Sequence, residues 1–439
     1  MSATWILLFA EMSLFTLTRI SKNAFLVKFI VLWKKTGFYL SVIRRALSGF
    51  LTGLNLSLWE RGLFMSSSEA IKVMIVDDSV LTRKYLSQII NDLENMEVIA
   101  TAPNGRIGIQ KAYLYKPDII ILDIEMPELD GIGFLKHLQE NSVPSVRPQI
   151  LIFSSIVGDG SRATFEALEH GAADFIKKPE GKISENLDYV KKEFEFKINE
   201  LYLNKRFPVK QVSREAVSKD DMSVIIEQDV YYGMEDLTTV LEKKSFSPEL
   251  IAIVSSTGGP NAIRKIFDTL GDLPIPMVIA QHMPAGFTTE FAKNLSQIYS
   301  RPVIEAEKGQ KLENGIIYIC PGGCHSLIKK SKGNFYLETD YKEYEGFFFK
   351  PSSDLFFKSI YEAVDKQVLG VILSGMGKDG AIESVNLRKA GALIMAQDKN
   401  SSVVWGMPGN AVRSGGVDII LNINDLGNAI NTVMSKVLR

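Results

Sequence analysis

The chain has 439 residues, of which 46% are hydrophobic and 23% are charged, and its formal net charge is −1. At about 150 residues per domain this length predicts two or three folded units of a globular protein. The balanced charge gives no reason to expect a nucleic-acid partner. Cys320 and Cys324 have only one histidine near them, which is too few ligands for a zinc site. Nothing favours an oxidising compartment, so we expect reduced thiols in a cytoplasmic protein.

Residues 1–64 differ from the rest because they carry eight Lys or Arg against two Glu. Their apolar runs are interrupted by Glu11 and Lys28, so neither run reaches the roughly 20 residues that span a bilayer. A basic amphipathic membrane anchor and a secretory signal are two alternatives. We favour a third, in which this extension is an artefact of an upstream start codon and the native protein begins at Met65.

From residue 70 to about 200, apolar strands alternate with amphipathic helices, which predicts a doubly wound α/β domain. The expected strands are 72–76, 97–102, 118–122, 149–153 and 174–177. Asp77 and Asp78 follow the first strand and Asp123 follows the third, at the edge where such sheets bind ligands. Three acids so close together need a cation, and their oxygen ligands suit Mg²⁺ better than zinc. The alternative is that these acids only end strands in solvent.

Two further groups end strands of the same sheet, namely the hydroxyl of Ser154 and the ammonium of Lys178. Together with the acids they could hold a phosphoryl group on Asp123. The segments Ile-Val-Asp-Asp-Ser, Ile-Leu-Asp-Ile-Glu-Met-Pro-Glu-Leu-Asp-Gly, Phe-Ser-Ser and Lys-Lys-Pro, in this order, resemble a response-regulator receiver domain of flavodoxin-like fold.

The resemblance implies a role for each of these residues. Asp123 is the expected phosphoacceptor. The expected Mg²⁺ ligands are Asp77, Asp78, Asp123 and the carbonyl of Glu125. The expected switch residues are Ser154, Lys178 and the aromatic Phe175.

A helix is expected to run to about residue 204, where Phe207-Pro208 breaks it. The charged stretch 205–247 reads as a linker between two domains. Alternation of strands and helices resumes over 248–435, which predicts a second α/β domain with a mostly parallel sheet. Its expected strands are 250–254, 276–280, 316–320, 368–373, 392–396 and 417–421.

The first strand of this domain runs directly into Ser255-Ser256-Thr-Gly-Gly-Pro. Such a turn places hydroxyls at a strand end, and the glycines let N–H groups gather at a helix N-terminus, where negative charge is favoured. This is a candidate nucleophile site, although a helix N-cap is the simpler reading. His282 follows the next strand and is a candidate base, and Asp379 ends a third strand in a glycine-rich loop and is a candidate orienting acid.

The order Ser, His, Asp differs from that of the α/β-hydrolases, and the Gly-x-Ser-x-Gly motif is absent. A triad is defined by geometry, so the order is no objection. The segments Ser-Ser-Thr-Gly-Gly-Pro, Gln-His-Met-Pro-Ala-Gly-Phe-Thr, Pro-Gly-Gly-Cys-His, Lys-Pro-Ser-Ser-Asp, Gly-Met-Gly-Lys-Asp-Gly and Gly-Met-Pro-Gly-Asn-Ala resemble the catalytic domain of the chemotaxis-type protein-glutamate methylesterases.

By this resemblance Ser256 is the nucleophile, His282 the base and Asp379 its orienting acid, and the backbone N–H of Met376 helps to stabilise the oxyanion. The family usually has Gly-Ala where this chain has Val254-Ser255, so Ser255 is the alternative nucleophile. His325 is expected to be structural or to line the substrate cleft.

The resemblance implies hydrolysis of glutamyl γ-methyl esters on the cytoplasmic domains of chemoreceptors, and deamidation of receptor glutamines, without a cofactor for the esterase step. A chemotaxis histidine kinase is the implied phosphodonor, and membrane contact occurs only through the receptors. The unphosphorylated receiver would cover the catalytic cleft, and a fragment from about Ser247 onward would be active without phosphodonor. The alternative is a non-catalytic output domain that binds a partner, DNA or a nucleotide, but helix-turn-helix and Gly-x-Gly-x-x-Gly patterns are absent.

Overall fold

The computed structural model describes residues 70–437 except 142–146, 156–159, 180–186, 207–229, 245 and 364–367. The proposals for residues 1–64 and most of the expected linker lie outside these residues. Among the described residues, no helix combines the length and apolar character required to cross a membrane.

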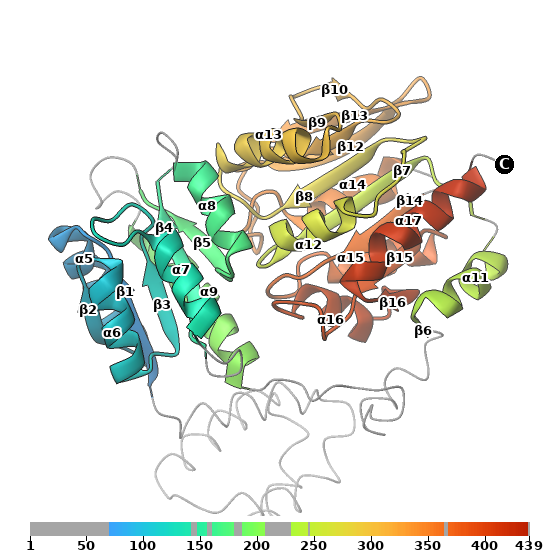
Figure 1. Cartoon of the computed structure of the whole chain (residues 1–439). Helices are drawn as coiled ribbons and strands as arrows, with labels where there is room; N and C mark the ends of the chain where they lie inside the picture. The colour runs from blue at the N-terminus through green and yellow to red at the C-terminus, as the bar shows by residue number, and fades with distance from the viewer. Residues whose placement is uncertain are drawn as a thin grey trace, which may run out of the picture. The chain divides into compact units, whose positions relative to one another are not determined.

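The first domain contains a five-stranded parallel sheet with the order β2-β1-β3-β4-β5 (Figure 1). Its strands are β1 Ile71–Val76, β2 Met96–Ala102, β3 Ile119–Leu122, β4 Gln149–Ser154 and β5 Asp174–Lys177. The apolar runs are explained by this topology, because strands of a parallel sheet are covered on both faces. The predicted doubly wound architecture is confirmed.

Five helices cover this sheet: α5 Val80–Asn91, α6 Gly105–Tyr115, α7 Gly131–Asn141, α8 Gly160–Glu169 and α9 Leu187–Arg206. Buried residues of α5 and α9 share one apolar cluster, and those of α6, α7 and α8 lie in another, as expected for helices on opposite faces. Ser79 caps α5 by accepting a hydrogen bond from the Thr82 N–H.

The second domain contains an eight-stranded sheet with the order β6-β16-β15-β14-β7-β8-β11-β9, in which every pairing is parallel. Its strands are β6 Tyr231–Tyr232, β7 Leu250–Ser255, β8 Met277–Gln281, β9 Val303–Glu305, β11 Ile317–Ile319, β14 Val368–Ile372, β15 Leu393–Gln397 and β16 Ile419–Leu421. The predicted parallel α/β sheet is confirmed, with β6 and β9 as additional edge strands.

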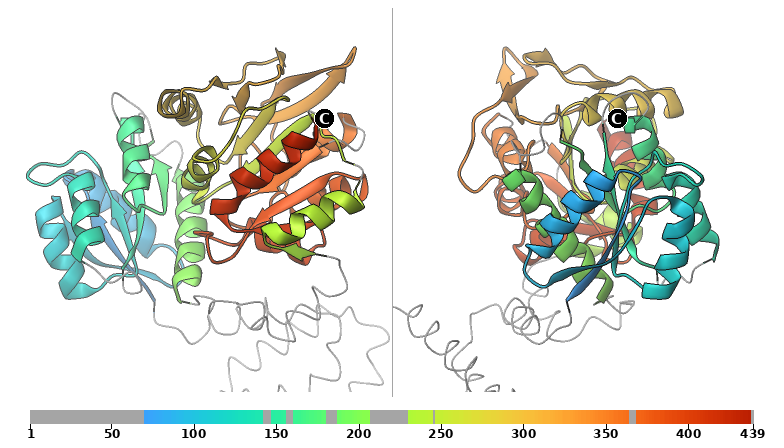
Figure 2. Two further views of the ribbon diagram at one scale, coloured as in Figure 1. Left: turned by 45° about the vertical axis from the view of Figure 1, so that its right-hand side comes forward. Right: turned by 90° about the vertical axis from the view of Figure 1, so that its left-hand side faces the viewer.

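Helices cover both faces of this sheet (Figure 2). The helices on one face are α11 Met234–Lys243, α12 Gly259–Phe267, α13 Phe287–Tyr299 and α17 Ile423–Val437. Those on the other are α14 Ser353–Ala363, α15 Ala381–Lys389 and α16 Met407–Arg413. The central strands β14, β7 and β8 therefore have their carboxyl ends at one edge of a fully covered sheet, where ligands of such folds bind.

A small antiparallel sheet, β10-β13-β12, was not predicted from the sequence. It is formed by β10 Gln310–Lys311, β12 His325–Ser331 and β13 Asn334–Asp340. Lys332 and Gly333 join β12 to β13 with φ angles of 49° and 80°, a left-handed pair that suits a tight hairpin.

The structure corrects the expected linker at its C-terminal end. Residues 231–243 form β6, which pairs with β16, and α11, which packs on the second sheet. Leu237, Val240 and Leu241 are buried there. These apolar residues lie at helical spacing, so the second domain begins before residue 247.

Candidate functional site

Three carboxylates gather at the carboxyl edge of the first sheet. Asp77 and Asp78 follow β1 and Asp123 follows the adjacent strand β3, and one oxygen from each lies within 4.8 Å of the others. Asp77 and Asp123 are buried and Asp78 is exposed. Lys178, which follows β5, places its Nζ 2.6 Å from Asp123 Oδ2 and 3.1 Å from Asp77 Oδ2. The residues predicted from separate strand ends thus meet in space.

The electrostatics of this cluster suit a divalent cation. Burial, together with the charge of Asp77, raises the pKa of Asp123 to about 6, although Lys178 opposes the shift. Burial acts to lower the pKa of Lys178, but the two carboxylates raise it overall. One ammonium does not balance three carboxylates, and oxygen donors of this kind fit Mg²⁺.

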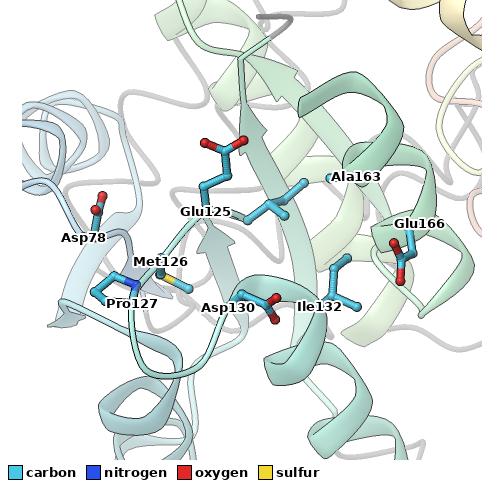
Figure 3. Close-up of a pocket in the computed structure, with 9 residues that line it drawn as sticks. Asp78, Glu125, Met126, Pro127, Asp130, Ile132, Ala163 and Glu166 are labelled. Atoms are coloured by element: carbon cyan, nitrogen blue, oxygen red, sulfur yellow. The ribbon is translucent and has the colours of Figure 1, made fainter. Parts of the chain in front are cut away.

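Asp78 and Glu125 line an open pocket of about 470 Å³ beside this cluster (Figure 3). Met126 and Pro127 of the loop after β3 form another part of its wall. The expected role of the Glu125 carbonyl stays a prediction.

The other predicted switch residues lie on β4 and β5. Ser154 is the last residue of β4 and is buried. Phe175 of β5 is buried as well, and its ring centroid lies 4.6 Å from that of Phe287 in α13. The Phe175 side chain therefore packs against the second domain. Both domains belong to one compact unit, residues 70–439.

The second site lies at the carboxyl ends of β7, β8 and β14. Ser256 directly follows β7, and its N–H donates to the Ser374 carbonyl beyond β14 at 3.0 Å. His282 directly follows β8, and its N–H donates to the Ser255 carbonyl at 3.0 Å. Gly258 has φ of 77°, a left-handed conformation that allows the sharp turn from strand into α12.

His282 and Asp379 are joined by a hydrogen bond of 2.9 Å between Nε2 and Oδ2. Three more donors hold the Asp379 carboxylate, all from the N-terminus of α14: the Ser353 N–H at 2.6 Å, the Asp354 N–H at 2.9 Å and the Ser352 hydroxyl at 3.0 Å. Burial opposes ionisation, but the contacts to His282 and the helix N–H groups lower the pKa of Asp379 below its ordinary value. The acid is therefore ionised and oriented.

The second imidazole nitrogen of His282 makes no hydrogen bond among the described residues. Nδ1 is buried and has no hydrogen-bond partner. Because ionised Asp379 can only accept, Nε2 carries a proton, and in the neutral tautomer with this proton the lone pair is on Nδ1. Within the part of the chain that the structure describes, no hydrogen bond joins Ser256 Oγ to His282.

Ser255 and Ser256 differ in how their hydroxyls are used. Ser255 is fully buried, and its hydroxyl donates to Gln281 Oε1 at 2.6 Å. Gln281 in turn donates from Nε2 to the Ser256 carbonyl at 2.9 Å. The Ser255 hydroxyl is thus part of a buried network that fixes the turn, which favours Ser256 as the reactive serine.

Met376 lies in a loop that is fixed on both sides. The Gly375 N–H donates to the Val404 carbonyl at 3.0 Å, and Asn410 Nδ2 donates to the Gly377 carbonyl at 2.7 Å. Between them, the Met376 N–H donates to no protein acceptor among the described residues. A backbone donor without a partner in a rigid loop suits an oxyanion site.

The sequence did not predict the residues that hold Asp379. Ser352 and Ser353 stand in the Lys-Pro-Ser-Ser-Asp segment, whose function the sequence did not reveal. His325 is buried, and its Nδ1 accepts the Ser352 N–H at 3.2 Å, so it supports the segment that holds Asp379. His137 in α7 and His170 after α8 take no part in this site. Cys320 and Cys324 are buried free thiols.

Both domains of the chain are similar to known proteins. The family model described as CheB methylesterase matches residues 251–430, and that described as response regulator receiver domain matches residues 73–190. A protein-glutamate methylesterase/protein-glutamine glutaminase of Treponema denticola is 37% identical over 83% of this chain and 98% of its own, and one of Sulfurimonas denitrificans is 34% identical over 84% and 99%. The crystal structure of the Thermotoga maritima CheB methylesterase catalytic domain is 31% identical, covers 43% of this chain and 99% of its own, and has a TM-score of 0.41. The chain therefore belongs to the protein-glutamate methylesterase/protein-glutamine glutaminase family, with a methylesterase domain joined to a receiver domain.

Proposed function

We propose that this protein hydrolyses γ-methyl esters of glutamyl side chains on chemoreceptors. Ser256 Oγ attacks the ester carbonyl and transfers its proton to His282 Nδ1, and the Met376 N–H stabilises the oxyanion. The bond to the methoxy oxygen breaks, and the imidazolium returns the proton so that methanol leaves. Water then attacks the acyl-enzyme with His282 as base, which releases the glutamate and restores Ser256.

Deamidation of receptor glutamines is the same acyl transfer with ammonia as the leaving group. It needs no additional residue, because His282 protonates either leaving group. No cofactor is required for this chemistry as we propose it.

The observation that carries the proposal is the state of His282. Its Nε2 is engaged by Asp379 at 2.9 Å, and its Nδ1 is buried without a partner on the strand end beside that of Ser256. Proton abstraction from a serine requires an imidazole that is oriented by an acid and has a second nitrogen available. A nucleotide-binding output domain would leave this pair without a function.

We further propose that phosphorylation of Asp123 by a chemotaxis histidine kinase controls access to this site. Mg²⁺ held by Asp77, Asp78 and Asp123 would neutralise the charge of the phosphoryl group. Lys178 would contact the phosphoryl oxygens and Ser154 would move toward them. The protein would act in the cytoplasm on the cytoplasmic domains of receptors.

Contacts between the two domains support this control. In β5, the Asp174 carboxylate accepts a hydrogen bond from the hydroxyl of Thr257, the residue after the nucleophile. Phe175 packs on Phe287, and Asn261 of α12 donates to the Leu168 carbonyl at 2.7 Å. The receiver thus contacts the loop that carries Ser256, and a change at Asp123 would reach it through β5.

The test is methanol release from a receptor fragment that carries glutamyl methyl esters, measured with and without acetyl phosphate. Ser256→Ala should abolish release, because the nucleophile is lost. Ser255→Ala is the comparison variant and should retain measurable release, because it loses a hydrogen bond of the turn but keeps the nucleophile. Asp123→Asn should remove the response to acetyl phosphate. Release that survives Ser256→Ala but is lost in Ser255→Ala would contradict the assignment.

A further inference from the structure

An aromatic ring covers the face of the proposed catalytic base. The centroid of the Phe349 ring lies 4.9 Å from that of the His282 imidazole, and the two planes differ by only 11°. Phe349 stands in the segment that leads from β13 to α14 and is half-buried. The His282 side chain is only 4% exposed. The imidazole is therefore held between protein groups rather than solvated.

The hydrogen bond to Asp379 does not by itself fix the imidazole plane. Nε2 lies 2.9 Å from Asp379 Oδ2 and 3.3 Å from Ser353 Oγ, whereas Nδ1 has no partner, so both contacts hold the same nitrogen and the ring can still rock about it, which would displace Nδ1. A parallel ring against the face prevents this motion. The same ring face also attracts the positive charge that His282 acquires once it takes the serine proton, because the face of an aromatic ring is electron-rich.

Phe349 is itself held by other aromatic residues. Phe348 contacts it edge-on at 5.1 Å, with an interplanar angle of 85°. On another side, Phe196 of the receiver helix α9 lies 5.1 Å from it at 55°. Tyr189, also of α9, stacks on Phe348 at 5.1 Å. The ring against the base is therefore packed from both domains.

We propose that Phe349 is a positioning residue for His282, which holds the imidazole plane and stabilises the imidazolium during acyl transfer. This inference rests on the proposed function, in which His282 is the base. It adds a residue outside the triad that acts on the rate of the chemical step and not on substrate binding.

The experiment uses the full chain saturated with acetyl phosphate and a receptor-derived peptide that carries a glutamyl γ-methyl ester. Phe349→Leu keeps apolar volume but removes the aromatic face, so kcat should fall about 2- to 30-fold while KM changes by less than about twofold. Phe349→Tyr restores the ring and should recover kcat. Phe347→Leu makes the same change two residues away, where the ring contacts Tyr344 instead of His282, and should keep the kcat of the wild type.

Equal kcat in the wild type and Phe349→Leu would overturn the inference. So would an equal loss in Phe349→Leu and Phe349→Tyr, which would indicate packing alone, or a change confined to KM, which would indicate a substrate-binding role. Ser256→Ala, measured in parallel, separates the two proposals. If it keeps its activity, the proposed mechanism fails, whereas an inactive Ser256→Ala with a fully active Phe349→Leu contradicts only the role of Phe349.

Discussion

Replacing Lys197 with methionine should destabilise the receiver domain by about 3–5 kcal/mol, because it leaves two buried carboxylates unpaired. Lys197 is 7% exposed, and its Nζ lies 3.1 Å from Glu193 Oε1 and 3.3 Å from Asp174 Oδ2. It also donates to the Phe175 carbonyl at 2.6 Å. Each ion pair at such distances is worth roughly 5 kcal/mol at an effective dielectric constant of about 20, before desolvation is subtracted.

Loss of the lysine affects the two carboxylates differently. Asp174 keeps hydrogen bonds from the Phe175 N–H and the Thr257 hydroxyl. For Glu193, burial raises the pKa and Asp174 adds to the shift, whereas Lys197 opposes it. A folded protein that contains a carboxyl with a raised pKa loses stability as pH rises through that pKa. The stability that Lys197→Met loses relative to the wild type should therefore become smaller as pH falls.

Thermal unfolding of the full chain, followed by circular dichroism at neutral pH, measures this effect on the receiver transition. Glu193→Gln added to Lys197→Met should recover more than half of the loss. Lys191→Met is the matched control on α9, because its ion pair with Asp92 is 4.0 Å long and exposed, and it should cost less than about 0.5 kcal/mol. A Lys197→Met protein as stable as the wild type, or a double variant less stable than the single one, would refute the reasoning.

Three further predictions concern the two sites. Burial, together with the charge of Asp379, raises the pKa of Asp354 from 3.8 to about 6, so the wild type loses stability as pH rises through this range. Urea unfolding should therefore show Asp354→Asn to be about 1–2 kcal/mol more stable than the wild type at neutral pH, which is half of the full linkage value because the carboxyl is partly exposed. The gain should vanish near pH 4, and destabilisation at neutral pH would contradict this prediction. Ser352→Ala removes the 3.0 Å hydrogen bond to Asp379 and should lower kcat about tenfold at nearly constant KM in the methanol assay. An unchanged kcat would show that the other three donors are enough to hold the Asp379 carboxylate. Asp78→Asn should weaken Mg²⁺ binding about tenfold by calorimetry, because one of the three carboxylates of the cluster is lost, and equal affinity would exclude Asp78 as a ligand.

Strand ends were the part of both sites that the sequence could predict. In a parallel sheet, residues that follow neighbouring strands share one edge, so Asp77 and Asp123 could be placed together without coordinates. The same reasoning brought His282 and Asp379 to one edge of the second sheet, where they form a hydrogen bond. The fold class followed from the same alternation of apolar runs and helices.

Contacts made by loops and helix ends could not be predicted in this way. Ser352 holds Asp379 from 27 positions away, through the start of a helix whose direction no local pattern specifies. Phe349 reaches His282 from an irregular segment without periodicity. Lys197 looks like any charged residue of an amphipathic helix until Asp174 is placed beside it. These side chains depend on tertiary packing, which spacing along the chain does not encode.

The early start of the second domain decides how it can be isolated. A fragment cut at Ser247 would lack β6 and α11, although β6 supplies the neighbour of β16 in the sheet. Without β6, β16 would become an exposed edge strand with unpaired backbone donors and acceptors, which can pair with another chain. Without α11, the apolar surface that Leu237, Val240 and Leu241 cover would be exposed. An inactive fragment of this kind would be explained by self-association or unfolding and would not test the role of the receiver. The second domain should therefore be expressed from residue 230 onward.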